Sequence, residues 1–249
     1  MAEAPQPMST TVLIRAGKSP GTLRKQAFTL IELLVVIGII AILASLLLPA
    51  LSRAKAAGLC AACKSNLHQM GIGLCLYTSQ YQQYPPWQPR GFSGPAGDWD
   101  YILLPFTGRN PGLFLCPARK PSSVWTNLTS ANPTYGYNAL GTGPHQKPLG
   151  LTGSLGNTNW RGLPEARVLV PCDMMAIADN PEMAKQDGDI TGALDEQDDY
   201  VANRHNRGAN VVFCDAHVEY GKQTNWMKAV ASVRKRWNND NQPHPETWR

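Results

Sequence analysis

Oxygen-bearing side chains in the segment 187–198 have the spacing of a calcium-binding loop. The segment reads DGDITGALDEQD, and positions 1, 3, 5, 9 and 12 are Asp187, Asp189, Thr191, Asp195 and Asp198. Calcium takes several oxygen ligands, and a glycine at position 6 permits the sharp turn of such a loop. Position 12 is Asp where a bidentate Glu is usual. We expect calcium as the one candidate ligand and no required cofactor; a solvated acidic loop is the alternative.

A second set combines histidine and aspartate side chains. Asp179, His205, Asp215 and His217 lie at or near the ends of predicted strands. A metal-dependent hydrolase would use such a set, provided that one coordination position stayed open. We favour a structural interpretation, in which Asp215 caps a hairpin turn and His205 hydrogen-bonds to it. Because the sequence also has no nucleophile elbow, phosphate loop or dinucleotide fingerprint, we expect no enzymatic activity.

Six cysteines could supply metal ligands or disulfides, at positions 60, 63, 75, 116, 172 and 214. Cys60 and Cys63 are close on a predicted helix, but a zinc site of the usual kind needs a second close pair. Cys116, Cys172 and Cys214 are isolated, so we expect no zinc. The sequence alone does not select a disulfide pairing, and buried free thiols are the alternative.

Positive charge is concentrated at the N-terminus. The formal charge of the 249 residues is +5. Residues 1–27 contain four basic residues and one acidic residue, a net charge of +3, which leaves +2 for the remainder. Nucleic-acid binding requires a dense basic face, so we expect no nucleic-acid partner.

The segment 28–51 is apolar and contains one charged residue, Glu32. About 20 apolar residues are enough to cross a bilayer. A carboxylate within the hydrocarbon costs roughly 2.5–3.5 kcal/mol, so it needs a partner. A secretory signal would have a shorter apolar core, and a plain membrane anchor would fit the length. Neither interpretation explains Glu32.

The residues AFTLIELLVVIGIIAILASLLLPAL (27–51) resemble the N-terminus of type IV prepilins and type II secretion pseudopilins. The resemblance implies that a prepilin peptidase and N-methyltransferase cuts between Ala27 and Phe28 and methylates the new amine. Arg24 and Lys25 precede the apolar run, and the positive-inside rule keeps them in the cytoplasm. The expected protein is a single-pass inner-membrane protein with a periplasmic C-terminal part, which then joins other pilin or pseudopilin subunits.

Glu32 gains a partner in this interpretation. After cleavage, the Phe28 amine lies one helical turn from Glu32. In a filament of parallel helices, Glu32 of one subunit would neutralise the Phe28 amine of its neighbour. A Glu32 side chain that reaches water by itself is the alternative. Pro49 belongs to the same assembly helix and should kink or loosen it, because it removes one backbone hydrogen bond.

Three further motifs resemble a subgroup of pilin-like proteins common in planctomycetes and verrucomicrobia. They are Cys-x-x-Asn-Leu at 63–67, Cys-Pro at 116–117, and His205 followed after nine residues by Asp215 and Ala216, where the subgroup has Gly. The resemblance implies a disulfide between Cys63 and Cys116 that fastens the long helix to the body. Cys172 and Cys214, each on a predicted strand, are candidates for a second disulfide.

The long helix should continue beyond the apolar run to about Tyr81. Hydrophobic residues recur with helical spacing and form one stripe, which consists of Leu59, Cys63, Leu67, Met70, Leu74, Tyr77 and Tyr81. The prolines of YPPW (84–87) end the helix. We therefore divide the chain into a leader (1–27), a transmembrane and assembly helix (28–51), a periplasmic half of the same helix (52–84) and a globular part (85–249).

The globular part should contain short strands and loops. Segment 97–108 predicts a short helix, and segments 134–140, 166–179, 209–215 and 217–221 predict strands. The last two strands should form a hairpin with a two-residue turn at Asp215–Ala216, whose second position favours positive φ. A final amphipathic helix at 225–237 would bury Trp226 and Trp237, with a basic face opposite.

The fold class that follows is α+β, a long N-terminal helix packed on a small antiparallel sheet with irregular loops. The function that follows is that of a structural subunit of a pilus or of a type II secretion-like pseudopilus. The alternative is a periplasmic binding protein or metal-dependent hydrolase with a pilin-type membrane anchor.

Overall fold

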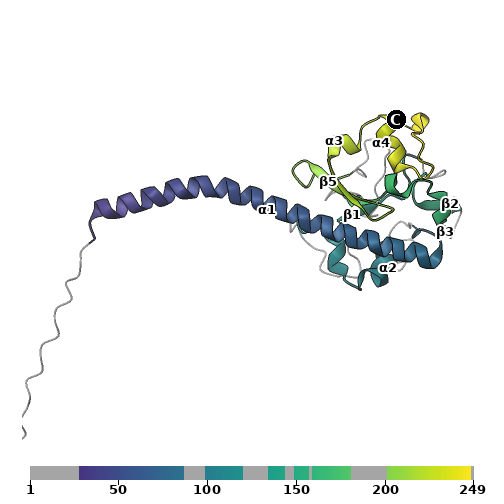
Figure 1. Ribbon diagram of the computed structural model, residues 1–249, viewed down its shortest axis with the longest axis horizontal. Helices are drawn as coiled ribbons and strands as arrows, with labels where there is room; N and C mark the ends of the chain where they lie inside the picture. The colour runs from purple at the N-terminus through teal and green to yellow at the C-terminus, as the bar shows by residue number, and fades with distance from the viewer. Residues whose placement is uncertain are drawn as a thin grey trace, which may run out of the picture. The chain divides into compact units, whose positions relative to one another are not determined.

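A computed structural model describes residues 28–86, 99–119, 134–143, 149–156, 159–180 and 201–247 (Figure 1). The chain divides into two compact units, Met1–Leu48 and Pro49–Arg249. One helix, α1 (Leu30–Tyr81), contributes to both units and continues through Pro49. The predicted long helix is therefore confirmed, to within two residues at its start.

In the first unit, α1 exposes apolar side chains on all sides. The large hydrophobic side chains from Leu30 to Leu48 are 46–74% exposed. Among the described residues, α1 is the one helix that is long and apolar enough to cross a membrane, with a mean hydropathy of 2.9 over its most apolar window. Among the residues of this unit that the structure describes, none covers that surface, as expected for a helix whose surroundings are lipid or other subunits.

The second unit is built on a four-stranded antiparallel sheet. Its strands, in the order in which they pair, are β1 (Tyr135–Tyr137), β4 (Met175–Asp179), β5 (Gly208–Phe213) and β6 (Val218–Lys222). A separate hairpin consists of β2 (Thr152–Gly156) and β3 (Asn159–Gly162). The four strands of the sheet lie where the sequence predicts strands, and the α+β class is confirmed.

Both faces of the central strands are buried, because successive side chains of a strand point to opposite faces. On one face, Val212 of β5 and Ile177 of β4 join the core with Leu67 and Leu74 of α1. On the other face, Phe213 packs in a second cluster with residues of the C-terminal segment. The predicted helical stripe is buried from Cys63 to Tyr77, whereas Tyr81 is half exposed.

Short helices cover the remaining sides of the unit. Figure 1 shows α2 on the side of α1 that faces away from the sheet. An added Cβ on Gly73 of α1 would lie 2.7 Å from Cγ2 of Thr107, the last residue of the η2 segment that follows α2, so η2 approaches α1 closely. The short elements are α2 (Trp99–Leu103), η2 (Leu104–Thr107), η3 (Pro111–Phe114), η4 (Glu165–Arg167), η5 (Pro171–Asp173) and η7 (Pro245–Thr247).

The predicted helix at 225–237 is wrong as a single element. The segment instead forms α3 (Gln223–Trp226), α4 (Ala231–Arg234) and η6 (Lys235–Trp237), with an extended residue at Val230. One straight helix would place the two tryptophans roughly 16 Å apart along its axis. The break lets both join the cluster around Phe213, and the Trp237 indole N–H donates to the Trp226 carbonyl at 3.2 Å. Tertiary packing thus overrides the helical periodicity.

The predicted two-residue turn between β5 and β6 is also wrong. The loop has three residues, since Phe213 N donates to the His217 carbonyl at 3.0 Å and Ala216 N donates to the Phe213 carbonyl at 2.9 Å. Ala216 takes the left-handed conformation, with φ of 72°. The positive φ that was predicted for this position is therefore present. This is the pattern of a turn followed by a bulge residue, where Gly is usual.

Candidate functional site

The first turn of α1 holds Glu32 in a capping box. The backbone N–H and the hydroxyl of Thr29 both donate to Oε2 of Glu32, each at 2.8 Å. In return, the backbone N–H of Glu32 donates to the Thr29 hydroxyl oxygen at 3.2 Å. This reciprocal pairing satisfies backbone donors that the helix start leaves open. This role was not predicted, although the spacing Thr-x-x-Glu is the signature of a capping box.

Four side chains that could bind a metal ion converge in the second unit. They are Cys63, Cys116, Asp179 and His205, and their ligand atoms all lie within 4.8 Å of one another. The Cys63 sulfur is 3.0 Å from Oδ1 of Asp179. Nε2 of His205 is 3.4 Å from the Cys116 sulfur and 3.4 Å from Oδ2 of Asp179. We refer to these four residues as the buried cluster.

Each member of the buried cluster comes from a different segment. Cys63 lies on the face of α1 that packs on the sheet, and Cys116 follows η3. Asp179 is the last residue of β4. His205 precedes β5, where reciprocal backbone hydrogen bonds with Gly208, both at 2.9 Å, fix its position. The cluster therefore forms only when α1, the η3 segment and the sheet have packed together.

Neighbouring donors orient the carboxylate and one thiol. Asn210 donates to Oδ2 of Asp179 from its backbone at 2.7 Å and from its side chain at 3.2 Å. The Arg204 guanidinium lies 3.9 Å from Oδ1. The Tyr135 hydroxyl donates to the Cys63 sulfur at 3.2 Å. The four cluster residues are at most 5% exposed, so these contacts stand in place of water.

Contacts within the buried cluster shift the pKa values of its members. Burial by itself lowers the pKa of His205, but hydrogen bonds and charge from Asp179 and Cys116 outweigh it and raise that pKa to about 10. The hydrogen bond with Cys63 lowers the pKa of Cys116, and the neighbouring His205 and Arg204 lower it further. The hydrogen bond with Cys116 raises the pKa of Cys63, and burial adds to this increase. A thiolate at Cys116 beside a cationic His205 is the arrangement that these contacts favour.

The predicted Asp/His set is only partly brought together. Asp179 and His205 meet in the buried cluster, whereas Asp215 and His217 form their own pair at the opposite end of β5. The predicted hydrogen bond between His205 and Asp215 is therefore wrong. Asp215 does cap the hairpin loop, since its Oδ1 accepts the backbone N–H of His217 at 3.2 Å.

All six cysteines are free in the structure, and the two disulfides stay predictions. Cys63 and Cys116 nevertheless lie side by side in the buried cluster. Cys214 is buried, whereas Cys172 is exposed. The predicted calcium ligands, Asp187 to Asp198, and the residue before the predicted cleavage site, Ala27, lie outside the described residues.

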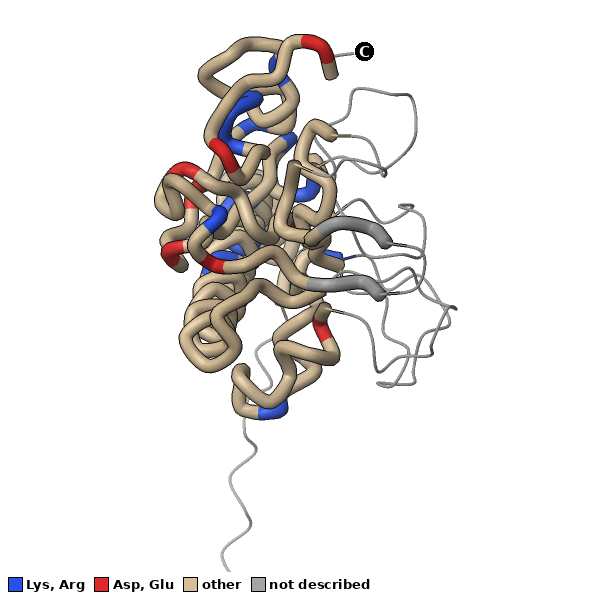
Figure 2. Tube along the Cα trace, turned by 90° about the vertical axis from the view of Figure 1, so that its right-hand side faces the viewer, with Lys and Arg blue, Asp and Glu red and all other residues tan. Residues whose placement is uncertain are grey.

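The predicted basic face of the C-terminal segment is only partly exposed to solvent: Lys228 is exposed, and Lys235 pairs with Asp173 at 2.8 Å. Arg234 is fully buried, and its guanidinium donates to the Met227 carbonyl at 2.9 Å. Arg236 bridges Asp173 at 2.9 Å and Glu219 at 2.8 Å. Figure 2 shows the same mixture, with basic and acidic residues near one another along the described trace. Arg236 holds the segment on the sheet, because Glu219 lies in β6 and Asp173 in η5. Arg234 bonds within the C-terminal segment itself.

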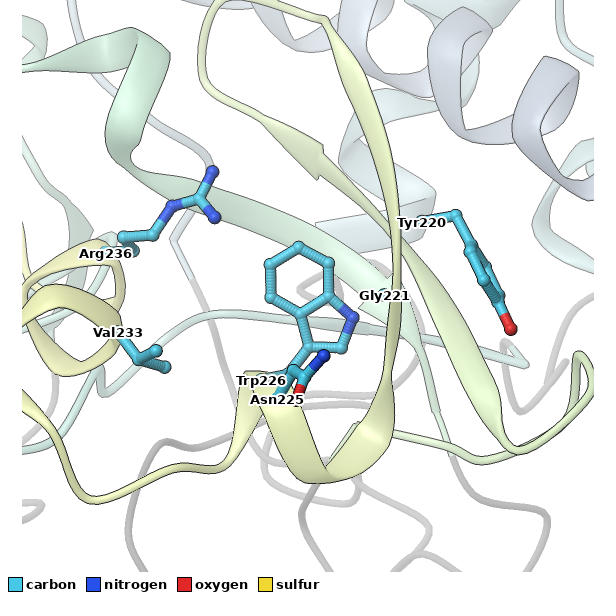
Figure 3. A pocket seen from close by; sticks show the side chains of 6 residues that line it. All are labelled: Tyr220, Gly221, Asn225, Trp226, Val233 and Arg236. Atoms are coloured by element: carbon cyan, nitrogen blue, oxygen red, sulfur yellow. The ribbon is translucent and has the colours of Figure 1, made fainter.

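A pocket of about 240 Å³ lies between β6 and the C-terminal segment (Figure 3). The indole of Trp226 forms its floor between Gly221 and the guanidinium of Arg236. That guanidinium also stacks on Phe213, 4.5 Å from the ring centroid. Because the charged group of the pocket is already paired, we assign no ligand to it.

The comparison with known families identifies the N-terminal segment. Residues 22–48 match the model of the prokaryotic N-terminal methylation motif. No curated protein and no solved structure matches the chain. The motif lies across the start of α1, and its apolar part is the exposed helical surface described above. A methylation motif on a long apolar N-terminal helix, followed by a small antiparallel sheet, fits a type IV pilin-like protein.

Proposed function

We propose that the chain is a structural subunit of a pilus or of a type II secretion-like pseudopilus. A prepilin peptidase would cut between Ala27 and Phe28 and methylate Phe28, and the subunit would assemble through the first half of α1. The observation that carries the proposal is the methylation motif on a helical surface whose apolar side chains are 46–74% exposed. In a filament, the same surface would bury against other subunits.

The charge of Glu32 supports a specific contact between subunits. Both hydrogen bonds from Thr29 go to Oε2 of Glu32. Within the described residues, Oε1 is therefore available to the Phe28 amine of a neighbouring subunit. Such a contact would neutralise two charges that an apolar filament interior would otherwise leave unpaired.

Substitution of Glu32 separates the capping role from the charge role. Gln can occupy the same capping-box position as Glu, so Glu32→Gln keeps the cap and removes the charge. Glu32→Ala removes both. If the charge pairs with the neighbouring amine, both variants should fail to enter filaments while still accumulating in the membrane. Normal assembly of Glu32→Gln together with failure of Glu32→Ala would show that only the cap matters.

The N-terminus of the mature protein tests the processing step. Mass spectrometry of membrane-extracted protein should find a chain that begins at Phe28 with a methylated amine. A mature chain that begins beyond residue 51 would indicate a secreted domain and would refute the proposal. Co-purification of the subunit with sheared filaments is the matching test of assembly.

The buried cluster does not favour the hydrolase alternative. A catalytic metal site keeps an open position for water or substrate, whereas all four residues of the cluster are at most 5% exposed. We therefore expect a mechanical role for this chain, with no catalytic residue assigned. The proposed periplasmic location of the second unit follows from the basic residues that precede the apolar helix.

A further inference from the structure

We propose that the buried cluster is a structural zinc site, in which Cys63, Cys116, Asp179 and His205 bind one Zn²⁺ ion. The sequence predicts no zinc, because it lacks the second close pair of cysteines that a usual zinc site needs. The structure instead brings two sulfurs, one imidazole nitrogen and one carboxylate together from four segments. The proposal concerns the second unit and is independent of the filament role.

The spacing of the ligand atoms fits tetrahedral zinc. Bonds of about 2.0–2.3 Å place the ligand atoms of a zinc tetrahedron about 3.3–3.8 Å apart. The Cys63 sulfur is 3.0 Å from Oδ1 of Asp179, and the Cys116 sulfur is 3.4 Å from Nε2 of His205. The ligand atoms of the four residues all lie within 4.8 Å of one another. An ion could enter with shifts of a few tenths of an ångström at the closest pair.

The donor types favour zinc over calcium and magnesium. Calcium and magnesium prefer oxygen ligands, whereas zinc accepts thiolate, imidazole and carboxylate together. Asn210 occupies Oδ2 of Asp179 with two hydrogen bonds. Oδ1, which lies next to the Cys63 sulfur, is therefore the oxygen that faces the ion. Asn210 would not bind the ion itself; its hydrogen bonds to Asp179 would orient the carboxylate that does.

The charges balance when zinc is bound. Two thiolates and one carboxylate carry a charge of −3, and Zn²⁺ with the Arg204 guanidinium carries +3. A neutral set is what a fully buried site requires, because an uncompensated buried charge is strongly unfavourable. The Tyr135 hydroxyl, which donates to the Cys63 sulfur, would further stabilise that thiolate. Without a metal, a proton on Cys63 and one on His205 would balance the same charges.

The ion would fasten four parts of the second unit to one another. It would join α1 to the end of β4, to the segment after η3 and to the segment before β5. Cys63 and Asp179 are 116 residues apart in the chain, and Cys116 and His205 are 89 apart. Because the site is closed to solvent, it would stabilise this packing and would not take part in catalysis.

The experiment measures zinc in the full-length protein in detergent, purified without chelator. Elemental analysis should give about one zinc per chain, as expected for a single closed site. Cys116→Ser should remove this zinc, whereas Cys172→Ser should retain it, because Cys172 is exposed and outside the cluster. Replacement by Co²⁺ should produce the thiolate-to-cobalt absorption of a tetrahedral site in the wild type and in Cys172→Ser only.

A measurement on the wild type covers the case in which Cys116→Ser does not fold. Zinc should protect the two cluster thiols from alkylation under native conditions, and a chelator should expose both and lower Tm. Failure of the reduced wild type to take up added Zn²⁺ would overturn the proposal. So would a Cys63–Cys116 disulfide in protein taken directly from cells, since the bond would consume both thiolates. Neither result would affect assembly through Glu32.

Discussion

Gly71 of α1 allows the hairpin loop between β5 and β6 to lie directly on the helix. A Cβ added to Gly71 would lie 2.7 Å from Cγ2 of Val212 and 2.9 Å from Cα of Ala216. These distances are shorter than van der Waals contact. The loop cannot retreat easily, because the His68 ring contacts the Ala216 carbonyl at 2.9 Å and Ala216 N bonds to Phe213. Gly71→Ala should therefore push the helix and the sheet apart.

The magnitude follows from two opposing terms. Ala is favoured over Gly within a helix by about 1 kcal/mol. Overpacking a well-packed core costs about 1–3 kcal/mol. Gly58 supplies the matched control, because it lies on the same helix and an added Cβ would meet nothing within 4 Å. Gly58→Ala should gain the helical term alone, so Gly71→Ala should be less stable than Gly58→Ala by about 1–3 kcal/mol.

Thermal unfolding of the full-length protein in detergent measures this difference. Tryptophan fluorescence reports on the second unit, because Trp99, Trp226 and Trp237 are buried there. A change of 1 kcal/mol shifts Tm by roughly 2–4 °C for a domain of this size. The two variants should then differ by about 2–12 °C in Tm. Equal shifts for Gly71→Ala and Gly58→Ala would refute the inferred close contact.

Three further predictions concern the second unit. Ala216→Val should lower the free energy of unfolding by about 2 kcal/mol, because a β-branched residue is strained at the observed φ of 72°; urea unfolding measures it, and Ala216→Gly should show no such loss. Asn138→Ala should cost about 2–4 kcal/mol in the same assay, because its buried amide donates to two carbonyls, at 2.8 and 2.9 Å; a smaller loss would mean that water replaces the amide. Burial raises the pKa of Glu219, but Arg236 outweighs it and lowers that pKa below the ordinary 4.5. The stabilisation of the fold by ionised Glu219 is thus complete above about pH 4.5 and is lost as pH falls through the lowered pKa. Glu219→Gln should therefore lose less stability on acidification than the wild type. Identical acid profiles for the two proteins would contradict the ion pair.

Glu32 has an observed local role and a proposed role between subunits. The capping box with Thr29 is complete within one helical turn, so it needs nothing beyond the sequence of that turn. The proposed contact with a neighbouring subunit would use the charge of the same side chain. Substitutions that remove charge without removing the cap are therefore more informative than truncation to Ala.

The C-terminal segment shows where periodicity fails. Four hydrophobic residues have the spacing of one helical face: Trp226, Val230, Val233 and Trp237. Val230 is nevertheless 43% exposed. Both tryptophans are buried on the sheet, and the chain breaks its helix to place them there. Arg234 is buried as well, although its position in the sequence indicates a solvent-exposed basic face. The spacing of hydrophobic residues along a short segment does not determine which other elements that segment will contact.

The sequence by itself determined the elements whose information is local. A continuous apolar run with one acid defined the N-terminal helix, a stripe from Cys63 to Tyr77 defined its packed face, and β-branched runs defined the strands of the sheet. Only the tertiary structure decided which distant side chains meet. The buried cluster joins four segments, and the sequence analysis had placed its residues in two unrelated groups, Cys63 with Cys116 and Asp179 with His205. The physical reason is that secondary structure depends on contacts a few residues apart, whereas a site of this kind depends on how separate elements pack around a shared core.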